Sequence, residues 1–159
     1  MIRSLALVLA LLPLKSYAES YSLTQEHFDC MVLNSYFEAR DQSENGLMSV
    51  THTVLNRVFS TKYPNTACEV IKQAKRSSNG AIIRHRCQFS WFCDGLSDKP
   101  RDQYAYDHAI ITTRRALELW EYGYDITLGS THYHAKTVTP YWSKSLEYRT
   151  TIDGHHFYR

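Results

Sequence analysis

Long apolar segments are scarce in this sequence, and the only one is too short to cross a membrane. It covers residues 4–14, is interrupted by Pro13, and is well short of the roughly 18 apolar residues that suggest a membrane span. No later segment approaches that length, and internal repeats and low-complexity segments are absent. We therefore expect no stable membrane insertion of the mature protein.

An excess of charge of one sign is also lacking. The 159 residues carry a formal net charge of only +2, and basic side chains gather only in residues 72–76 and 84–86. Proteins that bind nucleic acid usually carry a broad surface of clustered Lys and Arg. The two short clusters are more simply interpreted as solvated faces, so we expect no nucleic-acid partner.

The N-terminus has the parts of a secretory signal peptide. A short start containing Arg3 precedes the apolar run, and Ser16-Tyr17-Ala18 ends it with small residues at both positions that signal peptidase reads. Cleavage after Ala18 would leave residues 19–159, enough for one domain with a sizeable core. It would remove Arg3 and Lys15 and no acid, so the formal net charge would fall from +2 to 0. We expect a secreted or periplasmic protein.

The four cysteines include no Cys-x-x-Cys pair, the spacing that favours a structural zinc site. An even number of cysteines in an exported chain most simply forms disulfides. Cys87 and Cys93 are close enough in sequence to close a local loop, which leaves Cys30 to pair with Cys68. A zinc site made of all four cysteines is the alternative.

Hydrophobic periodicity predicts a mainly α (α+β) domain. Apolar side chains recur at intervals of three and four residues, most cleanly in residues 47–58. Residues 81–99 show no clean period and are expected to form an ordered loop. Residues 125–159 alternate weakly, which predicts short strands and a small β element near the C-terminus. Helices are expected at residues 24–39, 47–58, 67–76 and 101–122.

Glu38 lies near the end of the first expected helix, directly after Tyr36 and Phe37. Aromatic neighbours can desolvate a carboxyl and raise its pKa toward the range that suits a general acid. A Glu near a helix end is more often a solvated surface group, however. The spacing alone does not identify Glu38 as a catalyst.

An aromatic and polar run follows Cys87. Gln88, Ser90 and Trp91 combine an amide, a hydroxyl and a ring, and this combination suits a sugar, which has apolar faces and hydroxyl edges. The rings of this run are equally suited to the hydrophobic core. Asp94 precedes a glycine, which is ordinary turn chemistry.

Histidines gather in residues 132–134 and 155–156. Together with Asp94 or Asp153 they could form a zinc site. No His-Glu-x-x-His helix is present to complete a known arrangement, and these histidines are better interpreted as hydrogen-bonding groups of the fold or of a cleft. We expect no metal and no cofactor.

Several motifs in one order resemble the SleB-type cell-wall hydrolases, a family of spore-cortex-lytic enzymes with Gram-negative and phage relatives. The first is Glu38-Ala39-Arg40, and the resemblance covers nearly all of residues 30–158. The other matching segments are residues 54–58, 63–71, 87–95, 131–135 and 152–158.

The resemblance implies a lysozyme-like, lytic-transglycosylase-like single domain that cleaves peptidoglycan glycan strands between N-acetylmuramic acid and N-acetylglucosamine. It implies that Glu38 is the catalytic acid, and we expect the protein to act as a monomer. The family usually continues with Gly-Glu after the arginine, whereas this sequence has Asp41-Gln42. The residues expected to bind the substrate are Gln88, Ser90, Trp91, Tyr133 and His134.

Three alternatives to a one-carboxyl transglycosylase stay open. A muramidase-type hydrolase would need a second carboxylate, for which Asp94 and Asp41 are the candidates. A metal-dependent peptidase would use the C-terminal histidines, and a wall-binding module would present aromatic side chains without catalysis. The enzyme hypothesis predicts a cleft in which a partly buried Glu38 meets Gln88, Ser90 and Tyr133.

Overall fold

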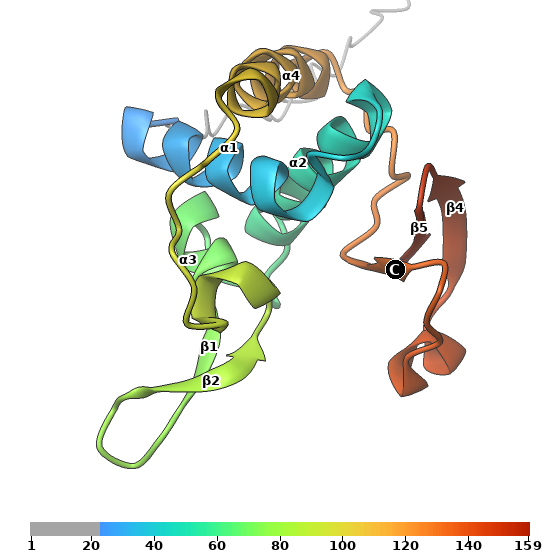
Figure 1. The fold of residues 1–159 in the computed structure, drawn as a ribbon. Coiled ribbons are helices and arrows are strands. Elements are labelled where there is room, and N and C mark those ends of the chain that lie inside the picture. The colour runs from blue at the N-terminus through green and yellow to red at the C-terminus, as the bar shows by residue number, and fades with distance from the viewer. Residues whose placement is uncertain (1–22) are drawn as a thin grey trace, which may run out of the picture.

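Three packed helices form the centre of the fold in the computed structural model, which describes residues 23–159 (Figure 1). They are α1 (Gln25–Ala39), α2 (Glu44–Val58) and α4 (Gln103–Glu121), and a short α3 (Ala67–Ile71) packs against the first two. None of the described helices is long and apolar enough to cross a membrane. The expected signal peptide lies outside the described residues.

Polar side chains fix where three of the helices begin. Thr24 accepts a hydrogen bond from the backbone of His27 at the start of α1, and Asp102 accepts one from Ala105 at the start of α4. Thr66 caps α3 in the same way. Such caps satisfy backbone N–H groups that have no partner inside the helix. The predicted helices at residues 24–39, 47–58 and 101–122 are confirmed within a few residues.

The hydrophobic core lies on both sides of α1. On one side Met31 packs with residues of α2, α3 and the aromatic run, including Leu55, Ile71 and Phe89. On the other side the core is shared with the first turns of α2 and with α4, and it contains Val32, Tyr36, Leu47, Val50 and Ala109. The Cys30–Cys68 disulfide joins α1 to α3. Helix α1 is therefore packed on both sides, which positions Glu38 in its last turn.

A two-stranded antiparallel hairpin extends from the helical part of the molecule (Figure 1). Its strands are β1 (Ala74–Arg76) and β2 (Ile82–Cys87), and the 3-10 helix η1 (Ser90–Cys93) follows. The Cys87–Cys93 disulfide closes this loop, so both predicted pairings are present. Two predictions were wrong here: the third helix ends at Ile71, and residues 81–99 contain a strand. Because residues 82–86 are all exposed, the strand shows no apolar alternation.

A three-stranded antiparallel sheet completes the fold, as the sequence predicts for the C-terminal segment. It is ordered β3 (His132–Ala135), β5 (His155–Tyr158), β4 (Tyr148–Ile152), and the 3-10 helix η2 (Tyr141–Ser145) lies between β3 and β4. The Asp153 carboxylate accepts hydrogen bonds from the N–H and hydroxyl of Ser43, and Gln42 Oε1 accepts one from Gly154 N–H at 2.9 Å. These contacts fasten the β4–β5 turn to the α1–α2 loop.

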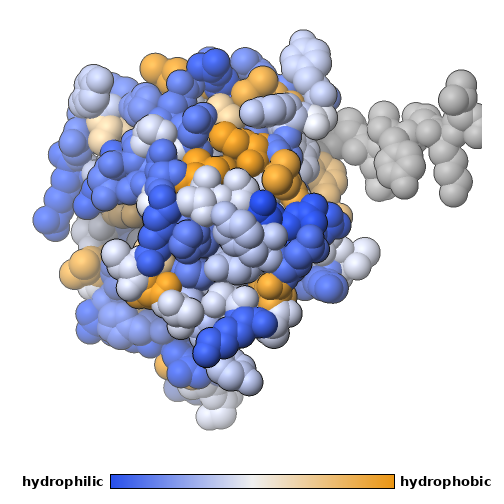
Figure 2. Space-filling model, turned by 90° about the vertical axis from the view of Figure 1, so that its right-hand side faces the viewer, coloured by the Kyte–Doolittle hydropathy of each residue, from blue (hydrophilic) through white to orange (hydrophobic). Residues whose placement is uncertain are grey.

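The side of the molecule that carries this sheet is largely polar. Figure 2 looks onto that side and shows hydrophilic and intermediate side chains over most of it, with small hydrophobic areas between them. A surface of this kind suits a hydrated polymer better than a lipid.

Candidate active site

Glu38 lies in the last turn of α1 and is partly buried. Burial raises the pKa of its carboxyl above the ordinary value, although the hydrogen bond from Tyr133 and the positive charge of Arg57 both oppose the rise. A carboxyl that keeps its proton to higher pH can donate it to a leaving group. Glu38 is therefore the desolvated carboxyl that the sequence left as the less common alternative to a solvated surface group.

Tyr133, in the middle of β3, brings the C-terminal sheet to Glu38. Its hydroxyl donates a hydrogen bond of 2.9 Å to Glu38 Oε2. Burial raises the pKa of Tyr133 well above its ordinary value, and the neighbouring carboxylate adds to the effect. The phenol therefore stays protonated and remains a donor. Its ring packs against His155 and Phe157 of β5, with ring centroids 5.2 and 5.5 Å away.

Arg57 of α2 is the third charged or polar group of this cluster, and it is only 5% exposed. Its Nε donates to the carbonyl oxygen of Thr131 at 2.7 Å, and the guanidinium lies over the rings of Tyr63 and Phe89 at 5.4 and 5.1 Å. Burial lowers the pKa of Arg57, and the negative charge of Glu38 is among the influences that raise it. Its position is suited to stabilise the ionised form of Glu38.

The sequence analysis did not select Arg57 as a site residue. It stands three residues after Val54 and seven after Val50, so it continues the apolar face of α2. A charged residue on the core face of a helix is rarely buried without a partner. Its position on the apolar face of α2 was the sequence signal that could have identified Arg57.

A cavity of about 630 Å³ adjoins the end of α1. Phe37, the residue before Glu38, lines it together with Ser90 and Asp94, and Glu38 itself is not among the lining residues. The wall carries hydroxyl, carboxylate and cationic groups beside aromatic rings, which suits an amino sugar. The full lining consists of Tyr36, Phe37, Arg40, Ser90, Trp91, Asp94, Leu96, Ser97, Asp98, Lys99, Arg101 and Asp102.

Trp91 is only 8% exposed, although it borders this cavity. Its indole N–H donates to Asn34 Oδ1 at 2.9 Å, and its ring stacks on Phe37 with centroids 4.9 Å apart. Most of the Trp91 ring therefore lies in the core, where it fixes the residue beside Glu38.

The other two expected substrate-binding residues do not line this cavity. Gln88 is exposed and lines a second cavity, at the β1–β2 hairpin. His134 is buried next to Tyr133 in β3, where successive side chains point to opposite faces. Its Nε2 lies 3.0 Å from the Tyr158 hydroxyl, and its ring stacks on that of Tyr158. The structure thus brings Tyr133 to Glu38 and Ser90 to the adjoining cavity.

The two candidates for a second carboxylate differ in their surroundings. Asp94 lines the same cavity as Phe37, and its Oδ1 accepts the N–H of Leu96 at 2.7 Å. Asp41 is exposed in the α1–α2 loop, and its Oδ1 accepts from the Gln42 side chain. Asp94 is therefore the better placed of the two.

The C-terminal histidines engage in other contacts. His132 lies against Tyr63 and Trp142, and His156 Nδ1 lies 2.6 Å from the Thr151 hydroxyl oxygen. Within residues 23–159, no three His, Cys, Asp or Glu side chains are grouped as a metal site would require. The expectation of no metal and no cofactor stays a prediction.

A desolvated carboxyl that accepts a hydrogen bond from a phenol, next to a cavity that suits a sugar, is compatible with the chemistry of enzymes that use a side-chain acid on glycans. Residues 41–158 match the cell wall hydrolase family, and the chain belongs to that family. The match begins three residues after Glu38. The protein is therefore an enzyme that acts on peptidoglycan. Its two disulfides fit the oxidising compartments outside the cytoplasm.

Two solved structures share the fold. The catalytic domain of the germination-specific lytic transglycosylase SleB from Bacillus anthracis superposes with a TM-score of 0.65 at 23% identity, covering 87% of this chain and 98% of that one. The catalytic domain of the Bacillus cereus SleB protein has a TM-score of 0.64 at 20% identity, covering 90% and 99%. No curated protein matches the sequence.

Proposed function

We propose that this enzyme is a lytic transglycosylase that cleaves the bond between N-acetylmuramic acid and N-acetylglucosamine, with Glu38 as general acid and then general base. One observation carries the proposal: the partly buried Glu38 carboxyl, whose pKa is raised by burial, is held at Oε2 by the Tyr133 hydroxyl. The other carboxyl oxygen accepts no hydrogen bond from residues 23–159. The SleB domain from Bacillus anthracis, which shares the fold, is described as a lytic transglycosylase.

In the first step the protonated Glu38 gives its proton to the glycosidic oxygen. The bond from this oxygen to C1 of the muramic acid breaks, and the N-acetylglucosamine leaves as an alcohol. Positive charge develops at C1, and Glu38 is now a carboxylate. Tyr133 and Arg57 favour this ionised form through a hydrogen bond and a positive charge.

In the second step the 6-hydroxyl of the same muramic acid forms a bond to C1. Its proton passes to Glu38, which returns to its starting state. No water is consumed, and the product is a 1,6-anhydro sugar. Because the nucleophile belongs to the substrate, the reaction requires only one carboxyl, and the exposed position of Asp41 is no obstacle to it.

The second candidate function is hydrolysis of the same bond by two carboxylates. The observation that favours it is the position of Asp94, which lines the cavity next to Phe37. In such an enzyme a water molecule or Asp94 itself would attack C1, and the product would contain the added water.

Mass spectrometry of the muropeptides released from purified sacculi tests the proposal. A transglycosylase releases products that lack one water relative to those of a hydrolase, and digestion continues in EDTA. Fully hydrated products in EDTA would instead support the two-carboxylate hydrolase. Cleavage in the peptide stems that EDTA abolishes would support a metal-dependent peptidase, and binding without any cleavage would support a wall-binding module.

A further inference from the structure

The β1–β2 hairpin and its flanks carry positive charge only. Between Glu69 and Asp94 the sequence contains no Asp or Glu, although the formal charge of the whole chain is small. The sequence alone suggested two separate solvated clusters, but the antiparallel pairing of β1 with β2 gathers them on one projection. The basic residues are Lys72, Lys75, Arg76, Arg84 and Arg86, and all five are exposed.

Within the described part of the chain, no acidic side chain forms an ion pair with these five residues. Arg76 donates to the carbonyl oxygen of Gly80, and Arg84 donates to that of Asp94 at 2.6 Å. The ion pairs found within residues 23–159 all involve other residues. The hairpin therefore presents unpaired cations, which attract an anionic ligand.

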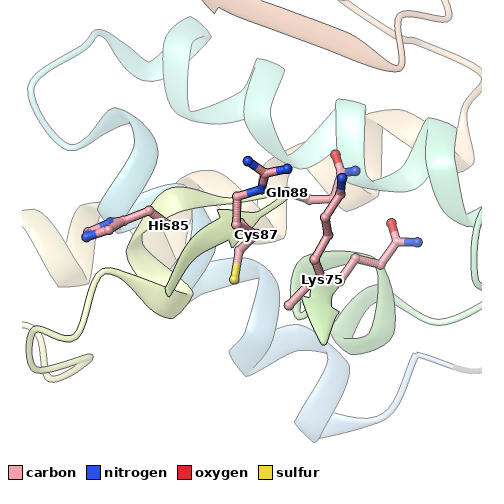
Figure 3. A pocket seen from close by; sticks show the side chains of 7 residues that line it. Lys75, His85, Cys87 and Gln88 are labelled. Carbon is pink, nitrogen blue, oxygen red and sulfur yellow. The ribbon is translucent and has the colours of Figure 1, made fainter. Parts of the chain in front are cut away.

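Part of this charge surrounds a cavity of about 440 Å³. Lys75, His85 and Arg86 line it together with Gln73 and Gln88. Figure 3 shows Lys75 and His85 on opposite sides of Cys87. The hairpin register shifts between Ala74 and Arg76, and His85 has a positive φ of 59°. This irregularity allows successive residues of β2 to line one cavity, whereas a regular strand would turn every second side chain away.

The hairpin cavity lies close to the larger cavity, which Phe37 lines. Gln88 lines the hairpin cavity and Ser90 lines the larger one, so their Cα atoms are at most about 7.6 Å apart. The Cys87–Cys93 disulfide and the hydrogen bond from Gln88 N–H to Gln73 O at 2.9 Å hold this connection. A branched polymer bound beside Phe37 can therefore place a side branch in the hairpin cavity.

We propose that the hairpin cavity binds the carboxylates of the peptide stems that branch from the glycan. Lys75 and Arg86 supply the charge that carboxylates require, and the amides of Gln73 and Gln88 can pair with peptide N–H and C=O groups. This choice of ligand rests on the proposed function, because only a glycan bound at Glu38 brings stems to the hairpin. The peptide-binding cavity would then increase the affinity for strands that carry stems.

The test measures binding to sacculi whose amines have been acetylated, with and without conversion of their carboxylates to glycinamides. The variant Lys75→Gln/Arg86→Gln removes the two cations of the cavity. The matched control Arg114→Gln/Arg115→Gln removes two exposed cations from α4, at the opposite end of the molecule from the hairpin (Figure 1). Thermal unfolding of both variants verifies that they are folded.

We expect the cavity variant to bind the acetylated sacculi roughly two- to tenfold more weakly than the unchanged protein does, since each exposed ion pair contributes a small factor. The control should bind normally. On glycinamide sacculi the unchanged protein and the cavity variant should bind equally. Added salt should weaken binding of the unchanged protein to the acetylated sacculi more than that of the variant.

Equal binding of the cavity variant and the unchanged protein to acetylated sacculi would overturn the inference, as would a loss that persists on glycinamide sacculi. A variant that loses binding to vesicles of anionic phospholipid, but not to sacculi, would assign the hairpin to a lipid surface instead. Clearance of sacculi is measured in parallel. If the protein binds stems but releases no glycan fragment, the proposed function fails while the cavity assignment stands.

Discussion

The Tyr133 hydroxyl donates a hydrogen bond of 2.9 Å to Glu38 across a sequence separation of 95 residues. It joins the end of the first helix to the middle of β3, so the last part of the chain completes the surroundings of a residue near its beginning. The bond stabilises the carboxylate, whereas burial stabilises the neutral acid. Opposing influences of this kind keep a carboxyl able to work in both protonation states.

Replacement of Glu38 by Gln should abolish lysis and leave the fold intact. The amide has nearly the same shape but cannot donate a proton to the leaving oxygen, and loss of a general acid typically costs about 10²- to 10⁴-fold in rate. The measurement is turbidity clearance of purified sacculi. Glu44→Gln, which removes an exposed carboxyl at the start of α2, should retain full activity. Clearance by Glu38→Gln within a few-fold of the unchanged enzyme would refute the assignment.

Replacement of Tyr133 by Phe should shift the pH profile toward the alkaline side. The hydrogen bond from Tyr133 lowers the pKa of Glu38, so its loss raises that pKa. Activity that requires protonated Glu38 is lost as the pH rises through this pKa, and this alkaline limb of kcat/KM should move to higher pH. The maximal rate should fall roughly tenfold because the carboxyl is less well oriented. An unchanged profile would mean that the bond has no influence on the reacting group.

Replacement of Arg57 by Met should affect both stability and the pH profile. The change removes the 2.7 Å hydrogen bond to Thr131 O and leaves that carbonyl without this donor. The free energy of unfolding should fall by about 1 to 3 kcal/mol, measured by denaturant unfolding. Loss of the positive charge should also raise the pKa of Glu38 and shift the alkaline limb in the same direction as Tyr133→Phe does. Arg57→Lys, which keeps the charge, should shift stability but not the limb.

Asp125 should make the fold sensitive to acid. Burial raises the pKa of its carboxyl, but the nearby His52 side chain and hydrogen bonds from Thr127 and Asn56 outweigh this and hold the pKa far below its usual range. The stabilisation is therefore complete above the pKa of the unfolded chain, near 4, and is lost as the pH falls toward the folded-state value. Asp125→Asn should lower the free energy of unfolding at pH 7 by about 1 to 3 kcal/mol and should flatten its decrease below pH 4. Equal acid sensitivity in the variant would contradict this account.

Position 42 should tolerate a glutamate, which the resemblance to SleB-type hydrolases leads us to expect there in place of Gln42. Gln42 Oε1 accepts the N–H of Gly154, and a glutamate offers the same acceptor. Gln42→Glu should therefore keep sacculus clearance within a few-fold of the unchanged enzyme. Gln42→Ala should lower the melting temperature, because it removes the hydrogen bond that joins the β4–β5 turn to the α1–α2 loop. If Gln42→Glu instead restored a large missing activity, the residue would belong to the chemistry.

Most of the helical architecture was predictable because the helices are amphipathic and several are capped. The pattern of residues 47–58 and the cap at Asp102 each have a local physical cause that one sequence displays. The hairpin had no such signal. All residues of β2 except Cys87 are exposed, and the register with β1 is irregular, so periodicity could not reveal the strand.

The surroundings of Glu38 were predictable only in part. The aromatic neighbours suggested a desolvated carboxyl, and the resemblance selected both Glu38 and Tyr133. Arg57 was not selected because its role depends on contacts with residues distant in sequence. These are the Thr131 carbonyl oxygen, in the loop before β3, and the ring of Phe89. Gln88 and His134 were expected to bind the substrate together with Ser90, Trp91 and Tyr133. In the structure Gln88 lines the hairpin cavity and His134 contacts Tyr158, so neither borders the cavity beside Phe37.

The long separation between Glu38 and Tyr133 also bears on the order in which the chain is made. During synthesis α1 emerges well before β3 and β5, so the Glu38 carboxyl exists for a time without Tyr133 or the sheet that supports it. The hydrogen bond from Tyr133 to Glu38 can form only after β3 has been made, and β3 pairs in turn with the final strand, His155–Tyr158. A chain that ends before this strand would lack the pairing that supports Tyr133 next to Glu38.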